Sequence, residues 1–154
     1  MKTRNAVILG GLLAGAVTTA AMFAGRKTGV LSKTLDRDSV DWIDNLTGSR
    51  ELIGDAGTSA VELANHLGAS VGFAAFYPPL RRALPGVPPV LLGVLFGTGL
   101  YVVNIAGIAP VLGITEGEVA AGPRKAAERW SLHVLQTVVT ALAIEAFADD
   151  LDND

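Results

Sequence analysis

The chain contains no cysteine, and only 2 of its 154 residues are histidine. The absence of cysteine excludes disulfides, thiolate metal sites, iron–sulfur clusters and cysteine nucleophiles. Charged residues are scarce as well, at 18% of the chain against about 25% in a typical soluble domain. The net charge of −3 argues against a nucleic-acid partner, which needs a basic surface. Few residues are therefore left for covalent catalysis or cofactor ligation.

Hydrophobic residues are abundant, at 50% of the chain, and 18 glycines add to them. The charges are grouped, so that long uncharged runs lie between them, and an α-helix needs roughly 20 such residues to cross a membrane. This pattern predicts an all-α integral membrane protein with the lipid bilayer as its partner. We expect a single transmembrane domain, a four-helix bundle with spans at residues 6–25, 61–80, 88–112 and 130–148.

The segments between the spans are polar. Residues 26–59 and 115–129 are expected as solvated loops, and residues 149–154 form an acidic tail. The first span also resembles a signal peptide, but its apolar run exceeds the usual 7 to 15 residues, so we expect a retained helix. Four spans place both termini on one side of the membrane. The raw count of Lys and Arg favours the two loops inside, but the charges are densest at the N-terminus and in the short turn between the second and third spans, so we expect both termini in the cytoplasm.

A short repeat links the first and third spans. Gly11-x3-Gly15 recurs 82 residues later as Gly93-x3-Gly97, and this spacing lets a neighbouring backbone approach a helix closely. His66 lies early in the second span, as His133 does in the fourth. The repeat predicts two helical hairpins related by a pseudo-two-fold axis. A chance match in a chain rich in Gly and Ala is the alternative.

The two histidines are the candidate cofactor-binding residues. His66 and His133 are expected at similar depth on parallel helices, the placement that a bis-histidine haem b requires. A proton or polar-ligand site and a purely structural role are the alternatives, and no separate metal site is indicated. Other polar side chains at helical spacing are expected to face the bundle interior: Ser70, Tyr77, Tyr101, Asn104, Thr137 and Thr140. Glu145, near the end of the fourth span, either reaches the interface or is functional.

No catalytic signature is present, neither a nucleophile elbow, a P-loop nor a His-Glu-x-x-His motif. We therefore expect no enzyme. The leading hypothesis is a membrane component that acts as an accessory or scaffold subunit, or as a homo-oligomer, through its glycine-rich faces. One alternative is a haem- or metal-binding redox or sensor protein. The other is a small transporter or channel, which requires a continuous polar path.

The pattern resembles the YagU-like family of small bacterial inner-membrane proteins. The resemblance rests on the glycine-rich run at 10–15, on His66 followed by Tyr77, on the segments 92–93 and 109–113, and on His133. It implies a multi-pass protein of the inner membrane and supplies no reaction. This chain has Asn104 near the place where family members can carry a third histidine.

Overall fold

The computed structural model describes residues 1–31, 34–149 and 151, and within them it contains helices and no strand. The predicted all-α class is therefore confirmed. Residues 32–33, 150 and 152–154, which include most of the expected acidic tail, lie outside the described part. The helices are α1 (Thr3–Lys27), α2 (Leu35–Thr47), α3 (Ser49–Ala74), α4 (Tyr77–Ala83), α5 (Pro89–Leu100), the π-helix η1 (Tyr101–Ile108), α6 (Ala109–Val111), α7 (Glu118–Ala121) and α8 (Pro123–Phe147).

Three helical runs of the described chain are long and apolar enough to cross a membrane. They are α1, the run Pro89–Val111 through α5, η1 and α6, and α8. These runs match the first, third and fourth predicted spans, which is consistent with a membrane protein. The helix at the second position, α3, is not among them: its first half carries Arg50, Glu51 and Asp55, and its second half contains the polar residues Glu62, Asn65 and His66.

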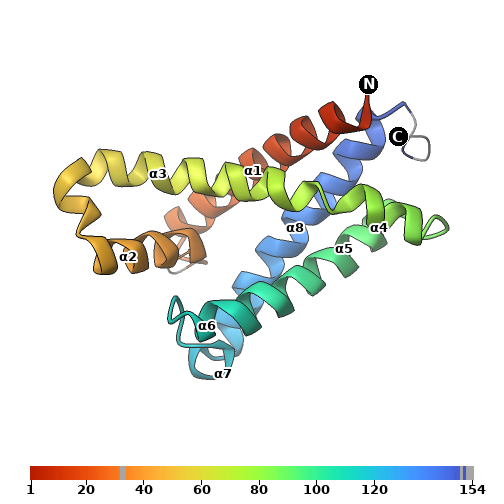
Figure 1. Ribbon diagram of the computed structural model, residues 1–154. Coiled ribbons are helices and arrows are strands. Elements are labelled where there is room, and N and C mark those ends of the chain that lie inside the picture. Colours follow the sequence, from red (N-terminus) through yellow and green to blue (C-terminus); the bar gives the residue numbers. More distant parts are fainter. Residues whose placement is uncertain (32–33, 150, 152–154) are drawn as a thin grey trace.

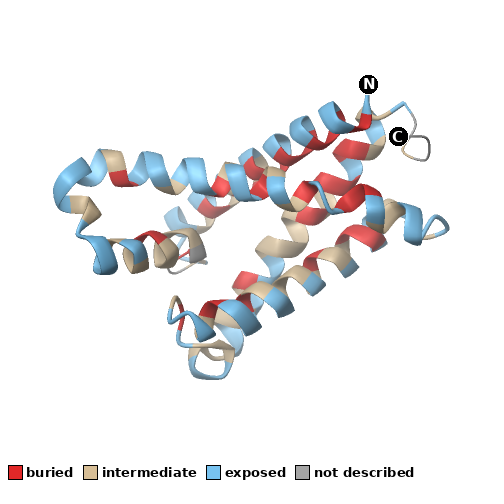
Figure 2. Cartoon of the chain, viewed as in Figure 1, coloured by how far each residue is buried: buried red, intermediate tan, exposed pale blue. Residues whose placement is uncertain are grey.

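The long helices pack in the order α3, α1, α8, α5. The closest contacts join α5 with α8, α1 with α8, and α1 with α3, whereas α3 and α5 are not among the closely packed pairs of the described chain. Figure 1 places the N-terminus of α1 beside the C-terminal end of α8, while α2, α6 and α7 lie at the opposite end. The buried residues gather where the long helices meet, whereas the first half of α3 is mostly exposed and α2 is mostly of intermediate burial (Figure 2).

The segment 26–59 is largely helical, so the prediction of a solvated loop there is wrong. α1 continues to Lys27, α2 occupies residues 35–47, and α3 begins at Ser49. α2 forms because its apolar residues recur at helical spacing, and Val40 is buried on that face. The second predicted loop, 115–129, likewise contains α7 and the first turns of α8.

The predicted span 61–80 is not one helix. α3 ends at Ala74 and α4 begins at Tyr77, next to the paired prolines that remove two backbone donors. Within α3, Gly54 has φ 67° and ψ 178°, a conformation that is essentially restricted to glycine, and it kinks the helix. The part of α3 that follows Gly54 packs against α1.

The third apolar run changes its winding before it ends. η1 is a π-helix, in which the N–H of Ala109 binds the carbonyl oxygen of Asn104. Pro110 lies in the last turn of this run, and the helix stops at Val111, one residue beyond it. π-Helical turns are frequent at functional sites, and this one carries Asn104 and Ile105 to the cavity described next.

Candidate functional site: a polar cavity between the long helices

A partly open cavity of about 170 Å³ lies where α1 and α8 meet, flanked by α3 and η1. Leu31 and Thr34, before α2, and Asp36 and Ser39, in its first turns, supply part of its wall. Both histidines of the chain line the cavity, as the sequence predicts for residues at similar depth. Its polar lining side chains are Thr18, Thr34, Asp36, Ser39, Asn65, His66, Asn104, Glu128, Arg129, His133 and Gln136.

His66 is fixed by contacts to two other helices. Its Nδ1 lies 3.0 Å from Oδ2 of Asp36 at the start of α2, and its Nε2 lies 3.2 Å from the carbonyl oxygen of Gly15 on α1. The side chain is 9% exposed. Ser70, one turn further along α3, donates to the carbonyl oxygen of His66 at 2.7 Å and accepts a hydrogen bond from Gln136 of α8.

Arg129 is the most deeply buried charge at the site, with a side chain 4% exposed. Its Nη1 donates to Glu118 Oε1 at 2.8 Å, and its Nη2 forms a longer ion pair of 3.5 Å with Asp38. Glu118 also accepts a hydrogen bond from the Tyr101 hydroxyl at 2.8 Å. Nε and Nη2 of Arg129 have no hydrogen-bond partner among the described residues.

His133 faces Tyr101 and its own helix. Its Nδ1 lies 2.8 Å from the carbonyl oxygen of Arg129, and its ring meets that of Tyr101 edge to face, with centroids 6.3 Å apart. Asn104 is nearby in the cavity wall, and its Nδ2 is a third buried donor without a hydrogen-bond partner in the described part of the chain. The cavity therefore contains more buried donors than the described protein atoms satisfy.

The six predicted lining residues occupy different places. Only Asn104 of this set lines the cavity; Ser70 and Tyr101 lie directly behind its wall. Thr137 donates to the carbonyl oxygen of Gly93, and Thr140 is buried in α8. Tyr77 lies outside the cavity, in an apolar cluster with Ala6, Val7, Ala74, Leu92, Ala141 and Ile144.

This apolar cluster separates the cavity from the end of the molecule that holds the termini. Along α1 the cluster contains Ala6 and Val7, and the cavity begins at Thr18, eleven residues or about 16 Å further on. Among the described residues, the polar lining of the cavity therefore begins about three turns beyond this cluster on α1. A channel requires one continuous polar lining, and that alternative stays a prediction. The arrangement is a pocket that ends against packed apolar side chains.

The residues present do not fit a bis-histidine haem. Both ring nitrogens of His66 are engaged, one by Asp36 and the other by Gly15. The cavity of about 170 Å³ is also smaller than the roughly 300–1,000 Å³ of pockets that hold drug-sized ligands. Within the described residues, no group of three His, Cys, Asp or Glu side chains is placed to hold a metal ion.

Glycines at the predicted packing positions contact the neighbouring helix closely. A Cβ on Gly11 would lie 2.7 Å from the Cα of Val71, and a Cβ on Gly93 would lie 2.7 Å from the Cα of Val138. At Gly15 and Gly97 a Cβ would meet Ser70 and Thr137, at 2.9 and 2.3 Å from their hydroxyl oxygens. No larger side chain fits these four positions unless the helices move apart.

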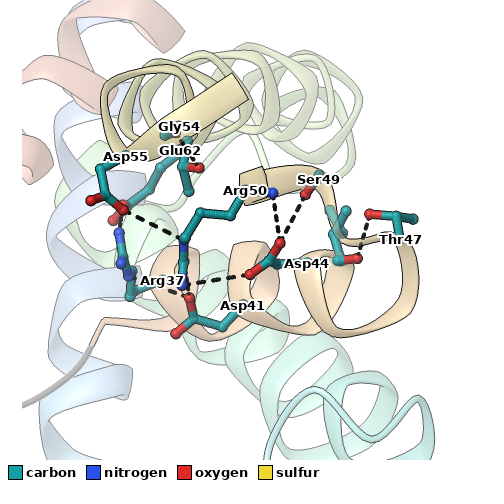
Figure 3. Close-up of polar contacts among 11 residues, drawn as sticks. Arg37, Asp41, Asp44, Thr47, Ser49, Arg50, Gly54, Asp55 and Glu62 are labelled. Atoms are coloured by element: carbon teal, nitrogen blue, oxygen red, sulfur yellow. Dashed lines mark hydrogen bonds and ion pairs between the residues drawn. The ribbon is translucent and has the colours of Figure 1, made fainter. Parts of the chain in front are cut away.

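Outside the apolar runs, ion pairs hold α2 against the start of α3 (Figure 3). Arg50 donates to Asp41 at 2.6 Å and pairs with Asp44 at 3.5 Å. The hydrogen bond to Asp41 raises the pKa of the Arg50 guanidinium above its ordinary value. Near α7, the hydrogen bond from Lys125 lowers the pKa of the Glu116 carboxyl.

Sequence reasoning missed Asp36, Arg129 and Gln136 as parts of the site. Asp36 and Arg129 fall in segments that were expected to be loops, and Gln136 was not counted in the polar stripe of the fourth span. One signal was available: Arg129 and His133 are four residues apart, so they share a helix face once α8 is known to begin before Trp130.

Comparisons with models of protein families, with curated proteins and with solved structures find no match. The resemblance to the YagU-like family therefore stays a prediction, and the case for function rests on the cavity and its surrounding helices.

Proposed function

We propose that this chain is a non-enzymatic, multi-pass protein of the cell's inner membrane whose polar cavity binds a small uncharged polar molecule. The observation that carries the proposal is the set of three buried donors in the cavity wall without a hydrogen-bond partner among the described residues, Nε and Nη2 of Arg129 and Nδ2 of Asn104. A buried donor without a partner costs about 1–3 kcal/mol. A ligand with hydrogen-bond acceptors would remove that cost.

The charge of the ligand follows from how the lining charges are paired. Asp36 pairs with His66, Glu128 with Arg124 at 3.1 Å, and Arg129 with Glu118. Because each of these lining charges already has a partner, a charged ligand would have to disturb one of the pairs. The cavity volume favours a molecule of a few heavy atoms, such as a simple amide or polyol.

The membrane arrangement in this proposal has four spans. The second half of α3, continued by α4, runs antiparallel to α1 and closes a hairpin with it, as α8 does with α5. Three of these helices are apolar enough to span alone. We assign the fourth crossing to residues 61–80, where neighbouring α1 covers His66 and Ser70.

Equivalent contacts support two hairpins that arose from one repeat. Gly11 meets Val71 as Gly93 meets Val138, and Gly15 meets Ser70 as Gly97 meets Thr137. The glycines of the two hairpins are related by an offset of 82 residues. The residues that they contact are related by an offset of 67, which also relates His66 to His133. A chance match in a chain rich in Gly and Ala gives no reason for the contacted residues to be equivalent as well.

Binding can be tested with acetamide and glycerol as neutral probes and with acetate and guanidinium as charged ones. We expect the neutral probes to raise the Tm of the detergent-solubilised full chain, because a ligand that binds only the folded state stabilises it. Asn104→Leu should abolish the shift, whereas Asn45→Leu, the same substitution at an exposed position of α2, should retain it. Shifts from the charged probes alone, or equal shifts in both variants, would contradict the proposal; no shift at all would mean that water satisfies the donors.

A second candidate is self-association, the scaffold role expected from glycine-rich faces. A Cβ on Gly68 or Gly72 of α3, or on Gly99 of α5, would meet nothing within 4 Å among the described residues, unlike the four packed glycines. Gly68 and Gly72 lie on the side of α3 that α5 leaves uncovered. This candidate predicts a detergent-solubilised protein mass above that of one chain.

A further inference from the structure

The ring of His66 stands between two hydrogen-bond acceptors. Nδ1 faces the Asp36 carboxyl at 3.0 Å, and Nε2 faces the Gly15 carbonyl at 3.2 Å. The Gly15 carbonyl also accepts a hydrogen bond from the Thr19 hydroxyl at 2.8 Å. A carbonyl oxygen never donates, and a carboxylate only accepts.

The two contacts of His66 fix the number of protons that the His66–Asp36 pair carries. A neutral imidazole carries one N–H, so beside a carboxylate one of the two contacts would bring a nitrogen lone pair against an oxygen lone pair. Both contacts are satisfied only when the His66–Asp36 pair carries one more proton, as imidazolium with carboxylate or as imidazole with carboxylic acid. Asp36 lies in the first turn of α2, where the helix dipole favours the carboxylate.

We infer that His66, Asp36 and the Gly15 carbonyl form a proton-binding site, and that the bound proton holds the first half of α2 against α1 and α3. The three groups come from three different helices, so the proton joins them directly. Loss of the proton leaves an acceptor facing an acceptor, and the contact between α2 and the α1–α3 hairpin weakens.

Charged and titratable groups face His66 from several of the surrounding helices. Glu62, one turn before it on α3, is paired with Arg37 of α2 at 3.5 Å. From η1 the neighbouring polar groups, Tyr101 and Asn104, are neutral, and the described residues of α1 near Gly15 carry no charge. The ionisable groups of α8 that share the cavity are Glu128, Arg129 and His133.

The other end of α2 is anchored independently. Arg50 ties Asp41 and Asp44 to the start of α3 (Figure 3), and an arginine keeps its charge at all accessible pH values. At the Asp36 end the proton acts beside the ion pairs of Arg37 with Glu62 and of Asp38 with Arg129, so its loss weakens this end. The end near Gly48 stays attached. Because Thr34, Asp36 and Ser39 line the cavity, movement at this end changes its wall. The effect of this movement on a bound molecule rests on the proposed function, whereas the proton site itself does not.

The proton can be observed directly because the chain has only two histidines. We would record ring-nitrogen NMR of the full-length, ¹⁵N-histidine-labelled protein in detergent, without added solute. The expected result is a His66 ring with two protonated nitrogens at about pH 6 that loses one proton as the pH is raised toward about 9. Asp36→Asn supplies an amide N–H to Nδ1, so His66 should carry a single ring proton at both pH values. Asp55→Asn, at a side chain 93% exposed, should behave like wild type.

Docking of α2 has a separate readout. In a Trp130→Phe background, Trp42 on α2 is the single tryptophan, and its emission should shift to the red as wild-type His66 loses its proton. The Asp36→Asn variant should show no such shift. A singly protonated His66 at about pH 6 in the wild type, or Asp36→Asn titrating like the wild type, would overturn the proton site. Titration of His66 with constant Trp42 emission would overturn the coupling to α2. Neither result depends on the solute-binding experiment, so the two proposals can fail separately.

Discussion

The carboxylate of Glu145, near the end of the apolar helix α8, is stabilised by two partners on α4. Its Oε1 accepts a hydrogen bond from the Tyr77 hydroxyl at 2.8 Å and pairs with Nε of Arg81 at 2.8 Å. Tyr77 is fully buried in the apolar cluster. The contacts join α4 to the last turns of α8, so Glu145 neither lines the cavity nor simply reaches the interface.

Removal of the Tyr77 hydroxyl should test this clamp. We expect Tyr77→Phe to destabilise the protein by about 1 to 3 kcal/mol, because Glu145 loses a charge-assisted hydrogen bond in a buried setting. The Tm of the detergent-solubilised protein measures the effect. Ser131→Ala removes an exposed hydroxyl that bonds only to its own helix, and it should change the stability by less than about 0.5 kcal/mol. Equal shifts in the two variants would refute the clamp.

Among the helices, those with a strong apolar pattern were predictable and the charged ones were not. α1, the run through α5 and η1, and α8 follow from the length of their uncharged segments. α2 and the start of α3 did not, because charged residues interrupt every long apolar run there, although the apolar residues of α2 recur at helical spacing. The same limit applies to the site: His66, His133 and Asn104 were found, but Asp36 is brought to His66 by the folding of α2.

The glycine contacts at the α1–α3 and α5–α8 pairs give an element-scale prediction. Gly11→Val and Gly93→Val should each destabilise the protein by about 1 to 3 kcal/mol, since the side chain would overlap the backbone of the partner helix. Gly72→Val places the same side chain on an α3 face that meets nothing within 4 Å in the described structure, so it should leave the Tm of the monomer near that of wild type. If Gly11→Val is harmless while Gly93→Val is not, the two hairpins are not packed equivalently.

At the scale of the whole molecule, the two hairpins do not form a closed symmetric bundle. A two-fold axis that exchanges α1 with α5 and α3 with α8 would pair α3 with α5 as closely as α1 with α8. α1 and α8 are in close contact, and α3 and α5 are not among the closely packed pairs of the described chain. Asn65 and Ala69 of α3, which line the cavity, are exposed. The packing is therefore asymmetric: one hairpin contacts the other through α1 and α8 and not through α3 and α5.

The number of membrane crossings can be decided by labelling, because a chain without cysteine accepts single reporter cysteines anywhere. Leu52→Cys on α3, Gly86→Cys before α5 and Val119→Cys on α7 all lie at exposed positions. If residues 61–80 cross the bilayer, a membrane-impermeant thiol reagent added from one side should label Leu52→Cys and Val119→Cys together, and Gly86→Cys only from the other. If α1, α5 and α8 alone cross, Leu52→Cys and Gly86→Cys should be labelled together and Val119→Cys from the opposite side. The second pattern would refute the four-span arrangement, because it places the two ends of α3 on the same face of the membrane.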